Sequence, residues 1–187
     1  MRRYSLKSLL LVIAVVAVIC AFVAYMIDRH RYAPVRAVLG GPEGFYLLRH
    51  AEKITVYRVQ PPTKFQIDPT LEDLTSEPEK KYPVIVGPVP VAANTAKPLI
   101  DLLSDKESYV LDGAKDYLYQ SEVRVDFIRG DHTLQVYFCF PGDVLVTYID
   151  GQFVAIEDFD VAAPDVIRWV QSLFPDDERI QNLDKTL

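Results

Sequence analysis

The strongest pattern in the sequence is an apolar run near the N-terminus. Nineteen consecutive residues, Leu9 to Ile27, contain no charge, proline or glycine, and they lie between Lys7 and Asp28. An α-helix rises about 1.5 Å per residue, so this run spans about 28 Å, close to the ~30 Å hydrocarbon core of a bilayer. The pattern predicts a basic leader over residues 1–8 and one transmembrane helix over residues 9–27, with the lipid bilayer as its partner.

Two other interpretations of this run involve processing. A cleaved signal peptide has a shorter apolar region, of about 7 to 15 residues, and small residues at its cleavage site. Here the run ends in the bulky residues Tyr25, Met26 and Ile27. A lipoprotein would be processed at Cys20, but the residue before it is Ile19 instead of a small one. We therefore expect the helix to be retained as an anchor.

Behind the anchor, the pattern predicts a linker and one domain. Residues 28–50 begin with several basic residues and continue through glycines and a proline, which is typical of a stalk. The following residues, 51–187, number about 135 and are enough for one domain with a single core. Within them, residues 61–83 contain five prolines and little apolar periodicity, so we expect a long exposed loop there.

Alternation of apolar and polar residues over 122–156 predicts an antiparallel meander of three or four strands with one buried face. The apolar positions are Val123, Val125 and Phe127 and then, after a turn at Gly130 and Asp131, Leu134, Val136, Phe138 and Phe140. Asp150 and Gly151 lie between two further apolar runs, which is a strong hairpin signal.

Two shorter strands and two helices complete the prediction. Lys53–Val59 is β-branched and aromatic, and Val84–Val91 is expected at a sheet edge because Pro88 and Pro90 cannot donate ladder hydrogen bonds. One helix should begin near Asn94 as its cap and bury Leu99, Leu102 and Leu103; the other should begin at Pro164 and bury Val166, Ile167, Val170, Leu173 and Phe174, with Trp169 at its margin. The predicted fold class is α+β: an antiparallel β-meander packed by two helices and preceded by one N-terminal transmembrane helix.

The formal net charge of −6 is unevenly distributed. Residues 1–49 hold seven Lys/Arg and two acids, which gives +5, so the remaining residues carry −11. A domain this acidic is repelled by a polyphosphate backbone, and we expect no nucleic-acid partner.

Charge does not determine in which direction the anchor crosses the membrane. Three basic residues precede it and three follow, namely Arg2, Arg3 and Lys7, then Arg29, Arg31 and Arg36. These counts tie under the positive-inside rule. A short basic leader before an apolar run resembles an export signal, so we expect the domain outside the cytoplasmic membrane. The reverse insertion, with a cytoplasmic domain, is the alternative.

Sequence motifs for cofactor or metal chemistry are missing. The sequence lacks phosphate-binding and dinucleotide-binding glycine loops and the serine hydrolase signature. His30, His50, His132 and Cys139 show no metal-ligand spacing, and Cys139 is expected to pack in a strand. We therefore expect no metal and no cofactor.

The acidic cluster Glu157, Asp158 and Asp160 is the weak candidate for catalysis. Carboxylates between a strand and a helix can bind calcium or act as an acid/base pair. The cluster does not match the calcium-loop pattern, and acids before a helix also favour its dipole without any ligand. A second acidic group, at residues 176–178, is interpreted as a solvated turn.

Two stretches resemble known proteins. The leader YSLKSLLLVIAVVAV is similar to anchors of planctomycete membrane proteins, in which a Ser-Leu-(Arg/Lys)-x-Leu-Leu motif precedes the helix. The segment from about Lys53 to Leu183 resembles a small bacterial family without an assigned function, through VYRVQP, KPLIDLLSDKESY, YFCF, EDFD and LFPDD. The resemblance implies a bacterial source and a retained anchor but no activity. Members of that family often carry two cysteines that this chain lacks, one at Gly142 and one in the region that reads DYLYQ here.

The sequence therefore favours a single-pass, membrane-anchored, non-enzymatic binding module of the cell envelope that contacts an envelope protein or ligand. The alternative is a membrane-tethered hydrolase that uses carboxylates, with Glu157, Asp158 and Asp160 as the first residues to test.

Overall fold

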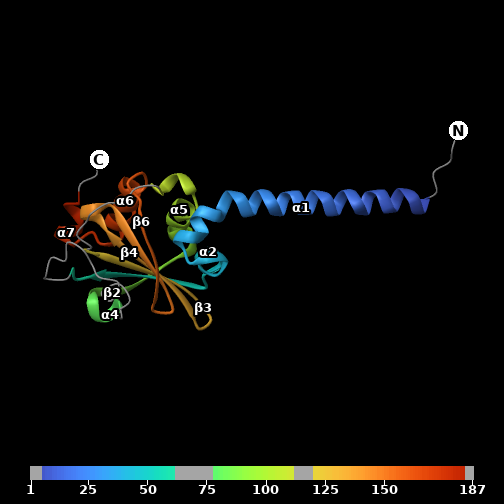
Figure 1. Cartoon of the computed structure of the whole chain (residues 1–187). Helices are drawn as coiled ribbons and strands as arrows, with labels where there is room; N and C mark the ends of the chain where they lie inside the picture. The colour runs from blue at the N-terminus through green and yellow to red at the C-terminus, as the bar shows by residue number, and fades with distance from the viewer. Residues whose placement is uncertain (1–5, 62–77, 112–119, 184–187) are drawn as a thin grey trace. The chain divides into compact units, whose positions relative to one another are not determined.

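The computed structural model describes residues 6–61, 78–111 and 120–183 of the chain. Contacts divide the chain into two units, residues 1–33 and residues 34–187. Helix α1 (Leu6–Val38) contains the predicted apolar run (Figure 1). Its side chains from Leu10 to Ile27 are exposed, and by length and composition the helix is able to cross a membrane once. This agrees with the predicted anchor helix.

The second unit begins within the segment expected to be a linker. Val35, Val38 and Leu39 are fully buried, and helix α2 (Gly41–His50) buries one side. Gly40 makes the sharp turn between the two helices with φ of 81°, and a Cβ atom there would lie 2.6 Å from Cδ1 of Ile149. The structure thus differs from the predicted stalk over 28–50, because apolar residues between the charges and glycines complete the core.

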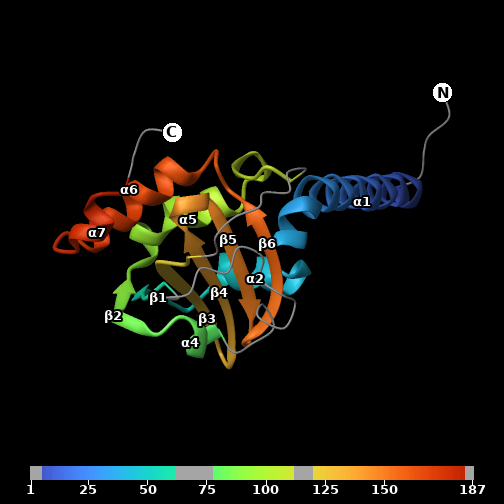
Figure 2. The same ribbon diagram turned by 60° about the vertical axis from the view of Figure 1, so that its left-hand side comes forward.

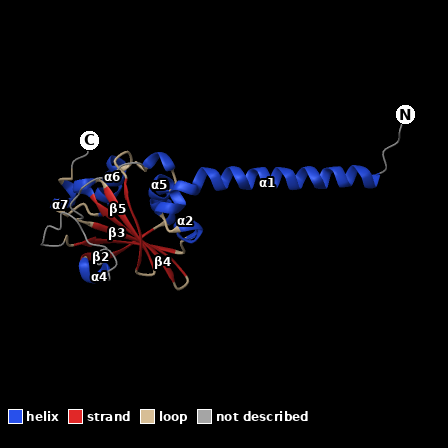
Figure 3. Cartoon of the chain, viewed as in Figure 1, coloured by secondary structure: helices blue, strands red, loops and turns tan. Residues whose placement is uncertain are grey.

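Six strands form one fully antiparallel sheet in the order β2-β1-β3-β4-β5-β6 (Figure 3). Their bounds are β1 Lys53–Val59, β2 Val84–Val91, β3 Val123–Arg129, β4 His132–Cys139, β5 Val144–Ile149 and β6 Gln152–Asp158. The last four strands are the predicted meander, and β2 lies at an edge as predicted. The α+β fold class is confirmed.

The predicted hairpin at Asp150 and Gly151 is present between β5 and β6. Both residues have positive φ, 50° and 77°, as the two-residue turn favoured between twisted strands requires. Its register pairs Ile149 with Gln152. The turn at Gly130 likewise pairs Arg129 with His132, so both turns fix the register of the meander.

One face of the sheet is apolar and lies beneath helices. This helix-covered face contains Val125, Phe127, Leu134, Val136 and Phe138, all fully buried. Helices α5 (Ala93–Leu103) and α6 (Ala163–Leu173) lie on the same side of the sheet as α2, and the four-residue helix α4 (Pro78–Lys81) lies on the other (Figures 1 and 2).

The two predicted helices form, with small differences. Helix α5 is capped by Ala92, and Asn94 is its second residue, with Oδ1 accepting a hydrogen bond from the Thr95 N–H. Leu102 in α5 and Leu173 in α6 are only half-buried. Trp169, expected at a margin, is buried, and its indole N–H donates to the Thr95 carbonyl at 2.7 Å, which joins α6 to α5.

The opposite face of the sheet is also buried, contrary to the prediction of one buried face. This polar face, defined by Tyr57, Arg124, Asp126, Gln135, Tyr137 and Tyr148, packs against Tyr82, which follows α4 and is fully buried. Tyr82 and α4 belong to the predicted exposed loop over 61–83; residues 62–77 of that loop lie outside the described part of the chain. The loop prediction therefore fails at its C-terminal end.

The predicted solvated turn is present at Pro175 and Asp176, which are exposed, but the acidic residues that follow it begin another short helix, α7 (Glu178–Gln181). Oδ1 of Asp177 accepts a hydrogen bond from the Ile180 N–H, while its Oδ2 lies 3.0 Å from Nε of Arg58 in β1. Arg179 of α7 pairs with the buried Glu122 beside β3 at 2.7 Å. Two ion pairs thus hold α7 against the sheet. In one the acid belongs to the α7 segment, and in the other the base does.

Candidate functional site

A hollow of about 510 Å³ opens on the polar face, between α4 and the turn that joins β5 to β6. We call it the acidic hollow. Its lining residues are Pro78, Glu79, Asp126, Asp131, Thr133, Gln135, Asp150, Gly151 and Gln152. Four of these nine are carboxylic acids and none is Lys, Arg or His, so the lining offers acceptors for a positively charged donor.

Asp126 and Arg124 form a buried ion pair at the inner end of the hollow. They lie two residues apart on β3, so both side chains project from the polar face. Nε of Arg124 is 3.0 Å from Oδ1 of Asp126, and both residues are 5% exposed. Neither atom has a hydrogen bond of acceptable geometry within the described residues, so the contact is electrostatic without good alignment.

Aromatic rings and a second carboxylate surround the Arg124 guanidinium. It stacks over the Tyr57 ring at 4.1 Å from the centroid, and Nη1 lies 3.4 Å from the Tyr137 hydroxyl and 3.5 Å from Oε1 of Glu79. Burial acts to lower the pKa of Arg124, but Asp126 and Tyr137 outweigh it and raise that pKa, so the guanidinium stays charged. Arg124 therefore serves as a fixed cation that positions the carboxylates on the hollow wall.

Burial raises the pKa of Asp126 to about 6, because removing the carboxylate from water outweighs the stabilising charge of Arg124. The nearby Glu79 adds to the rise by repulsion between like charges. At neutral pH the side chain is mainly ionised, and its charge is paired with that of Arg124, 3.0 Å away. A cation that enters the hollow would meet this carboxylate and that of Glu79.

Gln135 supplies an unsatisfied acceptor beside this pair. It lies directly opposite Asp126 in the register of β3 and β4, and it is 6% exposed. Its side-chain Oε1 is buried and accepts no hydrogen bond from the described residues. Buried polar atoms in proteins are nearly always hydrogen-bonded, because an unpaired one costs about 1–3 kcal/mol. Oε1 has almost no exposed surface, so a ligand in the hollow could bond to it only after the Gln135 side chain turned.

Asp150 and Asp131 form the outer end of the hollow at the hairpin turns. Oδ1 of Asp150 accepts the Thr133 N–H at 2.7 Å, and Oδ2 lies 2.8 Å from Nδ1 of the exposed His132. Burial acts to raise the pKa of Asp150, but the hydrogen bonds from His132 and Thr133 outweigh it and lower that pKa. The same contact raises the pKa of His132. Asp150 is thus a firmly ionised carboxylate at neutral pH.

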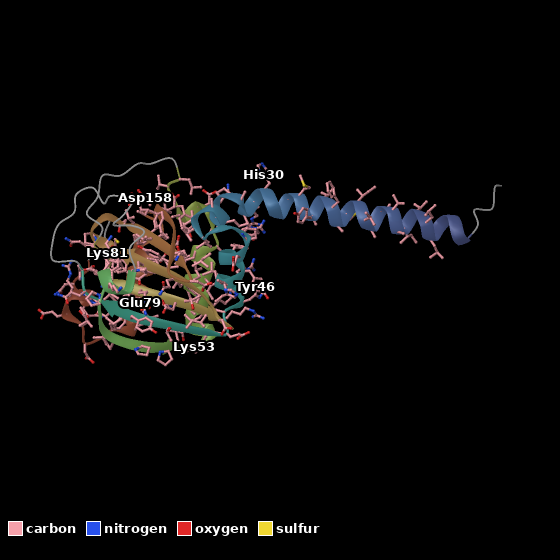
Figure 4. All side chains as sticks on the ribbon, turned by 60° about the horizontal axis from the view of Figure 1, so that its bottom comes forward. His30, Tyr46, Lys53, Glu79, Lys81 and Asp158 are labelled. Atoms are coloured by element: carbon pink, nitrogen blue, oxygen red, sulfur yellow. The ribbon has the colours of Figure 1, made fainter. Side chains whose placement is uncertain are left out.

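The predicted acidic cluster does not converge on the hollow. Glu157 and Asp158 are neighbours on β6, so their side chains project from opposite faces of the sheet. Asp158 is buried and its Oδ1 accepts a hydrogen bond from the Asp160 N–H at 2.9 Å, which stabilises the turn before α6. Asp158 and Glu79 lie apart on the domain (Figure 4). Burial, with repulsion from Asp158, raises the pKa of Glu157.

Cys139 packs in the interior, as predicted. It is fully buried beside Tyr137 and Tyr82, and its Sγ lies 3.0 Å from Oγ of Ser121. Burial raises the pKa of the thiol to about 12, which leaves it protonated and unreactive at neutral pH. Within the ranges 6–61, 78–111 and 120–183, no group of three or more His, Cys, Asp or Glu side chains is placed to hold a metal ion.

The sequence contained one overlooked signal for the hollow. A two-residue turn at Gly130 and Asp131 pairs Arg129 with His132, and the same register places Gln135 opposite Asp126 and Tyr137 opposite Arg124. Two of these three pairs, Asp126 with Gln135 and Arg124 with Tyr137, would then share one face of the sheet. Glu79 could not be found in this way, because it reaches the site from a segment distant in sequence.

Comparison with known proteins finds no match for this chain among protein-family models, curated proteins or solved structures. The resemblance to planctomycete anchors and to a small bacterial family therefore stays a prediction, and the function has to be argued from the site itself.

Proposed function

We propose that the protein is a single-pass, membrane-anchored binding module of the cell envelope, and that its acidic hollow binds a positively charged group of a ligand or partner. The apolar helix within α1 supports the anchor, since it has the length and composition to cross a bilayer. The absence of catalytic motifs from the sequence supports a binding role in preference to an enzymatic one.

One observation carries the proposal: the hollow combines ionised carboxylates with a buried acceptor that accepts no hydrogen bond. Asp126, Glu79 and Asp150 line the hollow as carboxylic acids, and Gln135 lines it too, with a buried Oε1 that accepts no hydrogen bond within the described part of the chain. A protein that used these carboxylates only for solubility would have no reason to bury Asp126 and Gln135. The arrangement stabilises a cationic donor.

A photocrosslinking amino acid incorporated into the full-length protein in native membranes tests the proposal. At Gln152, which is exposed and lines the hollow, we expect an adduct that weakens when Glu79→Gln and Asp150→Asn are introduced together. The matched control carries the crosslinker at Lys97 on α5, which is exposed on the opposite side of the sheet. Binding in the hollow would be refuted if the adduct yield were equal at Gln152 and Lys97. It would also be refuted if the yield at Gln152 were unchanged by the two substitutions.

The proposed location of the domain, outside the cytoplasmic membrane, is a separate question. It is supported by the basic leader before the apolar run, although Lys/Arg counts on the two sides are equal. A C-terminal reporter enzyme that is active only after export should be active on the full chain. Activity of a cytoplasm-specific reporter instead would place the domain and its ligand inside the cell.

A second candidate function, a carboxylate hydrolase, rests on Asp126 more than on the cluster at the end of β6. A buried carboxyl with a pKa of about 6, beside a second acid in an open hollow, is suited to proton transfer near neutral pH. Any hydrolytic activity found for the purified protein should then be lost in Asp126→Asn and kept in Glu157→Gln. Loss of the activity in Glu157→Gln but not in Asp126→Asn would instead assign catalysis to the acidic cluster Glu157, Asp158 and Asp160.

A further inference from the structure

We propose that the acidic hollow binds an elongated dication of the diamine class, a chain with a protonated amine at each end. This inference rests on the proposed binding function and specifies its ligand. It follows from the division of negative charge between two ends of the hollow, with uncharged polar groups between them.

The inner end is built to receive an ammonium group. Asp126 is buried and its Oδ1 lacks an aligned hydrogen bond within the described residues, and Oε1 of Gln135 lies beside it with none. Glu79 closes this end from α4, with a side chain that is 70% exposed and can move toward a ligand. An ammonium carries three donors and no acceptor, so it could bond to these groups, of which Asp126 and Glu79 already lie 3.0 and 3.5 Å from the Arg124 guanidinium.

The outer end holds a second, independent negative charge. Asp150 is held in place by the Thr133 N–H and lies beside the turn residue Asp131, which also lines the hollow. His132 lies beside Asp150, with Nδ1 2.8 Å from Oδ2, and its side chain is exposed. Between the two ends, Thr133 and Gln135 form an uncharged floor on β4.

The sheet register sets the spacing of the two ends. Asp126 is opposite Gln135, and the Asp150 N–H bonds to the Thr133 carbonyl, so Asp150 is two residues along and two strands across from Asp126. With strands about 4.8 Å apart and about 3.3 Å per residue, the two Cα atoms are about 12 Å apart. The two carboxylates therefore belong to separate ends of the hollow, and we take 1,4-diaminobutane as the representative short diamine.

The donor set favours an organic cation over a metal ion. Within the described residues no three acids or histidines converge as a metal site requires, because the carboxylates are spread over both ends of the hollow. The volume of about 510 Å³ exceeds what a single ion fills and is suited to a small chain molecule.

Calorimetric titration of the full chain in nanodiscs of zwitterionic lipid tests this inference. The probes are 1,4-diaminobutane, butylamine and 1,4-butanediol, which share one carbon skeleton and carry two, one and no positive charges. We expect 1,4-diaminobutane to bind at least about tenfold more tightly than butylamine, since each charged contact contributes about that factor, and 1,4-butanediol not to bind. Added salt should weaken the diamine most.

Two variants decide whether the two ends act together. Asp150→Asn keeps the turn, because asparagine accepts the positive φ of this position, and it should abolish the preference for diamine over monoamine. Asp165→Asn removes an exposed acid of α6 outside the hollow and should change nothing.

Equal affinity for butylamine and 1,4-diaminobutane, or an unchanged preference in Asp150→Asn, would overturn the diamine inference. If 1,4-diaminobutane fails to bind while the Gln152 adduct still depends on Glu79 and Asp150, the binding function stands and only the ligand class is wrong. If the diamine fails and the adduct is also absent, both proposals fall.

Discussion

The two faces of the sheet are buried to a similar extent but by different chemistry. On the helix-covered face, Phe127, Val136 and Phe138 contact apolar side chains and carry no polar atoms. On the polar face, Arg124, Asp126 and Gln135 are nearly as buried, yet several of their polar atoms lack aligned hydrogen bonds within the described residues. The first face contributes stability, and we infer that the second gives up some stability for binding.

This contrast also explains why the tyrosines of the described strands lie on the polar face. Tyr137 packs edge to face against Tyr148 and at a tilt against Tyr82, with ring centroids 5.4 and 5.2 Å apart. A tyrosine ring provides apolar area while its hydroxyl can face a polar neighbour, as Tyr137 does toward Arg124. The rings therefore form an intermediate layer between the apolar interior and the charged hollow.

The largest effect should come from the helix-covered face. Phe138→Ala removes a fully buried ring that packs against Phe140 and Phe159, and it should lower the free energy of unfolding by about 4 kcal/mol. Urea denaturation followed by the fluorescence of Trp169, the single tryptophan, measures it. Diamine affinity of the folded fraction should stay unchanged. An equal loss of affinity would show that the two faces are not separable.

A somewhat smaller loss is expected on the polar face from Arg124→Met. This variant leaves Asp126 buried without its cation, which should cost about 3 kcal/mol at pH 8. The loss should shrink at low pH, because protonation removes the uncompensated charge of Asp126. A double variant, Arg124→Met with Asp126→Leu, should recover most of the stability. If the double variant is less stable than Arg124→Met, the ion pair is more favourable than we argue.

Acidification should weaken the binding of 1,4-diaminobutane by about tenfold between pH 8 and pH 5. As the pH falls through about 6, Asp126 gains a proton and loses its attraction for a cation. His132, whose pKa is raised by its hydrogen bond with Asp150, becomes positive over the same range and competes at the outer end. Arg124 and Tyr137, whose pKa values are raised, keep their protonation states over this range, and Glu79 is the other acid near Asp126.

Titration calorimetry at several pH values measures this effect, and the Asp126→Asn variant should show a much flatter profile than the natural chain. An affinity that rises on acidification would contradict the role of Asp126 in binding.

The smallest change in stability should follow from Gln135→Leu, although its effect on binding should be clear. Removing a buried oxygen that accepts no hydrogen bond from the described residues should alter the free energy of unfolding by less than about 1 kcal/mol, in either direction. The affinity for 1,4-diaminobutane should fall several-fold because one acceptor is lost. A strong loss of stability would mean that Gln135 is structural. The polar face would then contribute to stability as the helix-covered face does.

Local chemistry made some elements predictable from the sequence. Asp150 and Gly151 fixed one hairpin because few residues adopt positive φ, and Pro88 and Pro90 placed β2 at an edge. The same logic failed for Arg124 and Asp126, because alternation of polar and apolar residues normally indicates a solvent-exposed face. Their burial depends on α4 and Tyr82, which come from a segment with no periodicity of its own.

The candidate site was harder to predict than the fold for the same reason. Glu157, Asp158 and Asp160 attract attention as neighbours in sequence, but adjacent strand residues face opposite sides of a sheet. Among the acids of the hollow, Asp131 is close to Asp126 in sequence, but Asp150 comes 24 residues after Asp126 and Glu79 comes 47 residues before it. Their proximity is a property of tertiary structure, which a search for short motifs cannot detect.

The burial of Val38 has a consequence for how the protein is made. The Thr147 hydroxyl donates to the Val38 carbonyl at 2.7 Å, a contact between residues 109 positions apart. The segment around Val38 can therefore be buried only after β5 has been synthesised. Contacts between residues so distant in sequence slow folding. Most of the domain must leave the ribosome, and must be kept from aggregating, before its first helical turn finds its partners.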